Sequence, residues 1–84
     1  MTVEQNIVNG NYSNNFPYNP NTWSEFHDES RRLKALFKSD LEAEHGLAGH
    51  PKADLLFDIA WEHGHANGYY DVEIHYSELA ELLK

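Results

Sequence analysis

The sequence predicts an all-α fold: a small helical bundle with one long helix and a C-terminal αα-hairpin, preceded by an irregular, asparagine-rich N-terminal arm. Three observations point to it. Apolar residues after position 22 recur every three or four positions, which is the helical period. Glycines separate these periodic stretches, as they do at helix ends. The chain has 84 residues and no cysteine, which fits one small domain without disulfides or thiolate metal ligands.

The first 21 residues are predicted to form an extended arm. Seven of them are asparagines, and Pro17 and Pro20 add further breaks. Asparagine side chains compete with helical hydrogen bonds, and proline lacks an amide donor. The arm also carries spaced apolar residues, Ile7 and Tyr12 among them. Two outcomes therefore stay open for the arm, which can fray or can dock on the domain or on a partner.

The remaining residues, 22–84, are predicted to form the helical domain. Its first helix runs from Trp23 to His45, with Thr22 and Glu25 in the pattern of a capping box and Gly46 as the stop signal. The apolar stripe of this helix consists of Phe26, Leu33, Leu36, Phe37 and Leu41.

Two further helices are predicted at residues 51–67 and 71–83. Pro51 suits a first helical turn, and Asp71 suits a cap. Between them, Gly64 and Gly68 are predicted to let two helices approach closely, with Gly68 at a positive φ. The predicted core positions of the two helices are Leu55, Leu56, Ile59 and Ala60 in the first, and Val72, Tyr76, Leu79 and Leu83 in the second.

The motifs predict neither catalysis nor a cofactor. The serines have no nucleophile-elbow motif around them, and no glycine-rich phosphate loop is present. His63 and His65 are two residues apart, so a helix would point them in roughly opposite directions. The stretch WEHGH also differs from the zinc-peptidase pattern HExxH. We therefore predict a non-enzyme without a metal site, with these histidines as hydrogen-bonding groups at a helical corner.

The charge of the chain restricts its partners. The net charge is −8, and residues 51–84 carry seven acids against two lysines. Such a surface repels phosphate backbones, so direct nucleic-acid binding is disfavoured and a basic protein surface is the predicted partner. The N-terminus has no basic segment followed by an apolar run, and no stretch is long enough to cross a bilayer. A cytoplasmic protein without a membrane partner is predicted.

An acidic row on the second helix is the main candidate site. Asp54, Asp58 and Glu62 are four apart, which places their carboxylates about 6 Å from each other along the axis. DNA phosphates have a comparable spacing, so the row can imitate a nucleic-acid backbone; the simpler interpretation is a solvated helix face. Aromatic residues are frequent anchors at protein interfaces. The predicted partner-binding residues are Asp54, Asp58, Glu62, Trp61, Tyr70 and Glu73.

A basic row lies on the first helix. Arg31, Lys34 and Lys38 are three and four residues apart, so they share one face. They can pair with acids of their own helix. Alternatively, they can meet the acidic row of a second copy, which would make the protein a homo-oligomer.

The C-terminal part resembles a recurring segment of small bacteriophage-encoded accessory proteins. The resemblance rests on HPKA at residues 50–53, AW at 60–61, GH at 64–65, Gly68, DV at 71–72 and the leucine-rich end at 79–83. Asp71 stands where that pattern has a glutamate. The resemblance does not cover the arm or the first helix and brings no catalytic residues. It implies a phage protein, for which binding and disabling a host factor is a common role.

Together these observations predict a small acidic phage-type protein that binds a host protein in the host cytoplasm and inhibits or redirects it. The expected target is a defence or nucleic-acid-handling enzyme, and nucleic-acid mimicry is one way to block it. A homo-oligomeric scaffolding module is the alternative. A metal-binding protein that uses His50, His63, His65 and His75 is the third hypothesis.

Overall fold

The chain folds into helices joined by short connections and one longer segment. A computed structural model describes residues 2–83. In chain order, the elements are α1 (Val3–Val8), α2 (Trp23–Glu44), α3 (Ala53–Gly64), the 3₁₀ helix η1 (His65–Asn67) and α4 (Tyr69–Glu81). The predicted all-α bundle with one long helix and a C-terminal αα-hairpin is confirmed. Within residues 2–83, no helix combines enough length with enough apolar character to cross a membrane.

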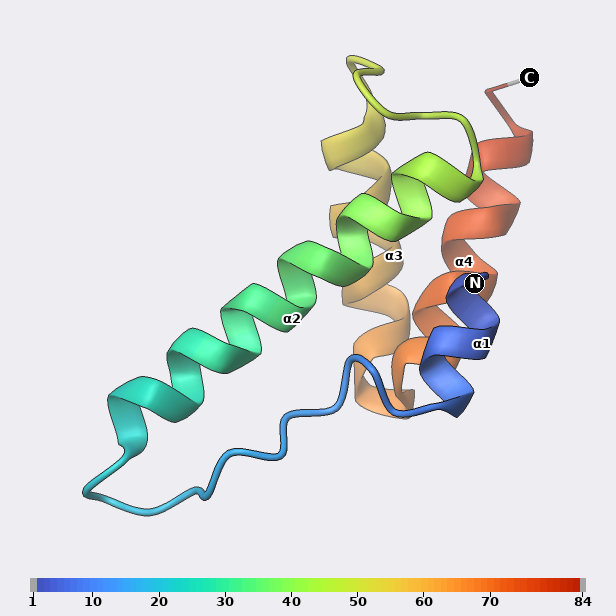
Figure 1. Cartoon of the computed structure of the whole chain (residues 1–84). Coiled ribbons are helices and arrows are strands. Elements are labelled where there is room, and N and C mark those ends of the chain that lie inside the picture. The colour runs from blue at the N-terminus through green and yellow to red at the C-terminus, as the bar shows by residue number, and fades with distance from the viewer. Residues whose placement is uncertain (1, 84) are drawn as a thin grey trace.

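The helices form two layers. The first layer is the antiparallel hairpin of α3 and α4, and the second consists of α1 and the C-terminal half of α2, both on one side of that hairpin (Figure 1). The N-terminal half of α2 projects beyond the bundle, together with the segment that precedes it (Figure 1). The molecule is therefore elongated, with principal extents of 46 × 24 × 22 Å. Within residues 2–83, one face of the α3–α4 hairpin is not covered by the other helices (Figure 1).

The core lies between the two layers. From α2 it takes Phe37 and Leu41, as predicted, whereas the predicted core residue Leu36 is exposed. On α3 the prediction was wrong by a rotation about the helix axis: Leu55 is 57% exposed, and Phe57 is buried in its place. The amphipathic spacing identifies a stripe, but the position of α2 decides which edge of that stripe it covers. The buried residues of the hairpin are Ala53, Leu56, Phe57, Ala60, Gly64, Val72, Tyr76 and Ala80.

The prediction of an irregular arm is wrong for the first residues, because Val3–Val8 form α1. A capping box starts this helix: the Thr2 hydroxyl accepts from the Gln5 amide (3.1 Å), and the Gln5 side chain accepts from the Thr2 amide (2.9 Å). The high asparagine content of the arm concealed this signal. Val3 and Tyr12 are buried in the main core, so the N-terminal segment docks on the domain.

Residues 9–22 have no regular helix, as predicted, but their asparagine side chains fix their path. The Asn14 amide group donates to the Phe26 carbonyl (2.9 Å) and to the Ser30 hydroxyl (2.7 Å), which attaches the segment to α2. The Asn19 carboxamide oxygen accepts from the amides of Asn21 (3.0 Å) and Thr22 (3.2 Å). Side-chain bonds of this kind replace a backbone ladder.

Two predicted caps are corrected. Thr22 precedes α2, but its hydroxyl donates to the Pro17 carbonyl (2.7 Å) and caps nothing. Asp71 is the third residue of α4, which starts directly after Gly68. The predicted positive φ of Gly68 is confirmed at 109°. The predicted second helix, residues 51–67, also begins later and ends in η1, so Pro51 lies before α3 rather than within its first turn.

Candidate functional site

The acidic row of α3 is exposed, as its spacing predicts. Asp54, Asp58 and Glu62 all face solvent on successive turns. The row is not free of basic partners, because Lys38 of α2 forms an ion pair with Asp54 and lies 3.8 Å from Glu42. The hydrogen bond to Asp54 is the main cause that raises the pKa of Lys38. Within residues 2–83, Asp58 and Glu62 form no ion pair, although the charge of Asp58 also contributes to the raised pKa of Lys38.

Trp61 lies on the side of α3 that faces α2. Its ring stacks on Phe57 and on His65, and the Lys34 ammonium sits 4.4 Å from its ring centre. Trp61 is half-buried between these neighbours. A shallow depression of about 250 Å³ adjoins it, between the bundle and the projecting half of α2. Trp61 is thus already engaged by a cation of its own chain.

Tyr70 and Glu73 of α4 lie in a second acidic group, which also contains Glu4 of α1 and Glu44 of α2. Tyr70 is 47% exposed, and its hydroxyl lies 3.5 Å from a carboxylate oxygen of Glu4. Glu73 is half-buried, and burial raises its pKa, with further contributions from Glu44 and Glu4. Among the described residues, Glu73 Oε2 has no hydrogen-bond partner. The group joins α1, α2 and α4, and residues so distant in sequence give no local pattern that would reveal it.

The six predicted partner-binding residues therefore do not form one surface. The row on α3 borders Lys38, Trp61 borders Lys34, and the Tyr70–Glu73 pair borders Glu4. Both lysines belong to the basic row of α2, so this row contacts side chains of its own chain: Lys38 pairs with Asp54, and Lys34 lies over the Trp61 ring. Arg31 likewise pairs with Asp28 of its own helix.

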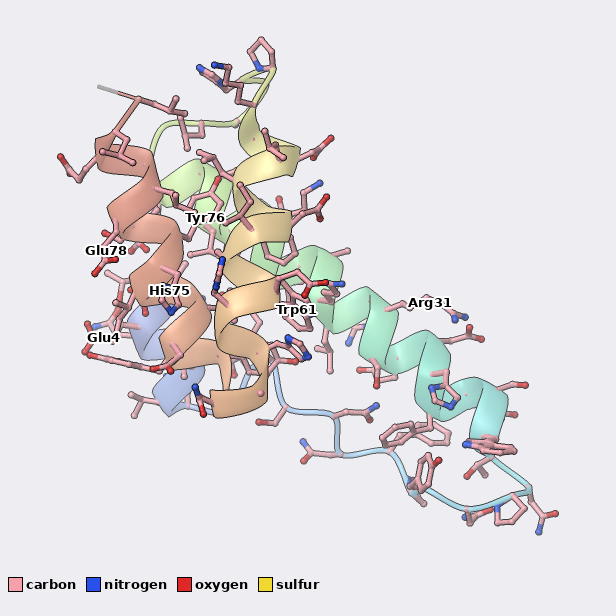
Figure 2. All side chains as sticks on the ribbon, turned by 180° about the vertical axis from the view of Figure 1, so that it is seen from behind. Glu4, Arg31, Trp61, His75, Tyr76 and Glu78 are labelled. Carbon is pink, nitrogen blue, oxygen red and sulfur yellow. The ribbon has the colours of Figure 1, made fainter. Side chains whose placement is uncertain are left out.

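The uncovered face of the α3–α4 hairpin was missed by the sequence prediction, because Leu55 and Ile59 had been assigned to the core. We call it the outer hairpin face. Figure 2 looks onto this side, with α2 behind the hairpin. Four-residue spacing aligns Leu55, Ile59 and His63 along α3, next to the exposed Asp58 and Glu62. Figure 2 shows His75 and Glu78 of α4 on this side, and four-residue spacing aligns Ile74 and Leu82 with Glu78.

The histidines occupy different environments. His65 Nδ1 lies 2.7 Å from the Trp61 carbonyl oxygen, and His50 Nδ1 accepts from the Lys52 amide (3.0 Å). The predicted role of His65 as a hydrogen-bonding group at the helical corner is therefore confirmed. His63 and His75 face each other across the hairpin, with ring centres 5.9 Å apart. In residues 2–83, no group of three or more histidine, aspartate or glutamate side chains is arranged to hold a metal ion.

These features define a small all-α protein with an uncovered helical hairpin whose exposed leucines and isoleucines lie among acidic side chains. The chain belongs to the family of unknown function DUF8546, whose sequence pattern matches residues 1–84. No curated protein and no solved structure matches the chain. The family description names neither a function nor an origin, so the phage resemblance and the host-binding role stay predictions.

Proposed function

We propose that this protein is a phage-type binding module that covers a basic surface of a host protein with its outer hairpin face. The expected target is a defence or nucleic-acid-handling enzyme, which the bound module inhibits or redirects. The observation that carries the proposal is the pairing of uncovered apolar residues with acids that form no ion pair within residues 2–83, on one face. Leu55 and Ile74 are 57% and 42% exposed there, and Asp58 and Glu62 stand beside Leu55.

The charge distribution supports a basic partner. Residues 23–35, the projecting half of α2, hold three acids and three bases, whereas the rest of the chain holds eleven acids and three bases. The projecting half of α2 therefore has no net charge, and the net charge of −8 comes from the rest of the chain. Complementary charge speeds the encounter of two proteins and rejects partners of the wrong sign. Apolar side chains covered by the partner add about 25 cal/mol for each Å² removed from water.

Nucleic-acid mimicry is the narrower form of this proposal. The spacing of Asp54, Asp58 and Glu62 supports it, but the ion pair of Asp54 with Lys38 neutralises one end of the row. Only Asp58 and Glu62 then remain as two adjacent negative charges. We therefore assign the binding to the combined apolar and acidic face, and treat mimicry of a phosphate row as a contribution to it.

The test uses two charge-reversal variants of equal charge change. A partner captured from host lysate on the immobilised protein is identified by mass spectrometry and purified, and its affinity is then measured. The variant Asp58→Lys/Glu62→Lys should bind at least about tenfold more weakly, because like charges opposed across an interface cost several kcal/mol. The control Glu25→Lys/Asp28→Lys changes the projecting half of α2 and should keep the affinity. Equal affinity of both variants, with unchanged helical circular dichroism, would contradict the proposal.

Self-association is the second candidate function. The uncovered Leu55 and Leu82, 57% and 79% exposed, favour it, since a second copy can bury them. The acids of the same face oppose it, because two copies would bring like charges together. Sedimentation at low and high salt separates the two functions: a scaffold is a dimer or larger at micromolar concentration, whereas the proposed binding module is a monomer at both salt concentrations.

A further inference from the structure

We propose that His63 of α3 and His75 of α4 together bind one transition-metal ion of the Zn²⁺ class on the outer hairpin face. The two residues are twelve positions apart in sequence, and neither has a histidine partner at helical spacing on its own helix. The hairpin brings them together. The proposal does not rest on the host-binding function, although both use the outer hairpin face.

The ring separation fits an ion shared by both imidazoles. A zinc–nitrogen bond of 2.0–2.1 Å places a ring centre about 3.2 Å from the ion. Two such rings are then about 5.2 Å apart at a tetrahedral angle and about 6.4 Å apart on opposite sides of the ion. The observed separation of 5.9 Å lies between these limits, with the ring planes inclined by 44°.

The surroundings favour a cation but supply no third ligand. On α4, Asp71 lies about one turn before His75, and Glu78 lies about one turn after it. On α3, Glu62 is the residue directly before His63. Figure 2 shows His75 and Glu78 on the same helix. These carboxylates attract a cation and can orient an imidazole through its other nitrogen. Since no group of three ligands exists in residues 2–83, water completes the coordination. Imidazole ligands select zinc over magnesium or calcium, which prefer oxygen.

An ion bound in this way joins the two helices of the hairpin. His63 lies in the last turn of α3, next to Gly64, and His75 lies in the middle of α4. A ligand that binds only the folded state raises the temperature of unfolding by mass action. At a free concentration ten times its Kd, the ion should raise the Tm by roughly 5–10 °C for a chain of this size.

The test titrates the untagged protein with Zn²⁺ by calorimetry at about pH 7.5, because metal binding needs the neutral form of imidazole. We expect one Zn²⁺ per chain at this site. His63→Ala and His75→Ala should each weaken binding by at least about tenfold, as loss of a ligand costs no less than loss of an outer-shell group. The control His50→Ala, on an exposed connection, should bind as the wild type does. Zn²⁺ should raise the Tm of the wild type and of the control only.

Three outcomes would overturn the proposal. The first is no Zn²⁺ binding tighter than millimolar. The second is a wild-type affinity that survives in either His63→Ala or His75→Ala, since the ion would then not be shared. The third is an equal response to Ca²⁺, which would assign the binding to surface carboxylates. Circular dichroism of each variant without metal verifies that the helices are intact, and alanine at the exposed His63 position is a good helix former.

Discussion

At the scale of the residue, the two fully buried tyrosines have opposite polar environments. Tyr12 is 1% exposed, and its hydroxyl donates to Asp40 (2.6 Å) and accepts from the Asn6 side chain (3.2 Å). Tyr76 is 0% exposed, and its hydroxyl has no hydrogen-bond partner among residues 2–83. Burial, with the charges of Glu42 and Asp54, raises the pKa of Tyr76 to about 12. One hydroxyl therefore stabilises the fold, and the other is only desolvated.

Removing these two hydroxyls should have different effects. Tyr12→Phe should lower the free energy of unfolding by about 1.5–3 kcal/mol, the range for a hydrogen bond to a charged group. Tyr76→Phe should leave it unchanged or raise it by up to about 1 kcal/mol, because an unpaired buried hydroxyl costs desolvation without return. Urea unfolding at neutral pH measures both. A loss above about 1 kcal/mol in Tyr76→Phe would mean that this hydroxyl is hydrogen-bonded.

At the scale of the element, the contact of α3 with α4 depends on one glycine. A Cβ at Gly64 would lie 2.7 Å from the Val72 amide nitrogen and 2.9 Å from the Asp71 carbonyl carbon. These are backbone atoms, which cannot rotate away. The close approach predicted from the spacing of Gly64 and Gly68 is thus confirmed at Gly64, whereas Gly68 supplies the positive φ before α4.

Gly64→Ala should lower the free energy of unfolding by about 1–3 kcal/mol, the usual cost of overpacking. The sign of the change is informative by itself. At an open helical position, replacing glycine by alanine stabilises by about 1 kcal/mol, because alanine has the higher helix propensity. Thermal unfolding followed by circular dichroism gives the result. A higher Tm than that of the wild type would show that the two backbones are farther apart than described above.

The elements also show what the sequence can predict. The three long helices follow from apolar spacing, because each buries one stripe against the others. The uncovered face does not follow, since Leu55 and Leu56 have equal hydropathy and only the packing of the folded chain distinguishes them. The predicted Thr22 cap fails for a similar reason: the Thr22 hydroxyl donates to the Pro17 carbonyl, a contact that is visible only in the fold. The pairing of His63 with His75 likewise depends on the register of the hairpin.

At the scale of the whole molecule, the N-terminal segment is part of the domain and not an appendage. Residues 22–84 were predicted to form the helical domain, and the sequence left open whether the arm frays or docks. In the structure Val3 and Tyr12 belong to the same buried cluster as Phe37 and Val72, and the Val3 amide donates to Glu44 at the end of α2 (3.3 Å). An 84-residue chain has a small core, so two buried side chains are a large share of it.

A chain that begins at residue 22 should therefore lose its cooperative thermal transition, although α2 can keep part of its helicity. In the full-length chain, Tyr12→Ala should cost about 3–5 kcal/mol, as large-to-small changes of buried aromatic residues do. Tyr18→Ala is the matched control, because Tyr18 lies in the same segment but is 62% exposed, and it should cost less than about 1 kcal/mol. Thermal and urea unfolding followed by circular dichroism compare the three proteins. A truncated chain that unfolds cooperatively at the wild-type Tm would make the segment dispensable, and its asparagine contacts to α2 would then serve another purpose than folding.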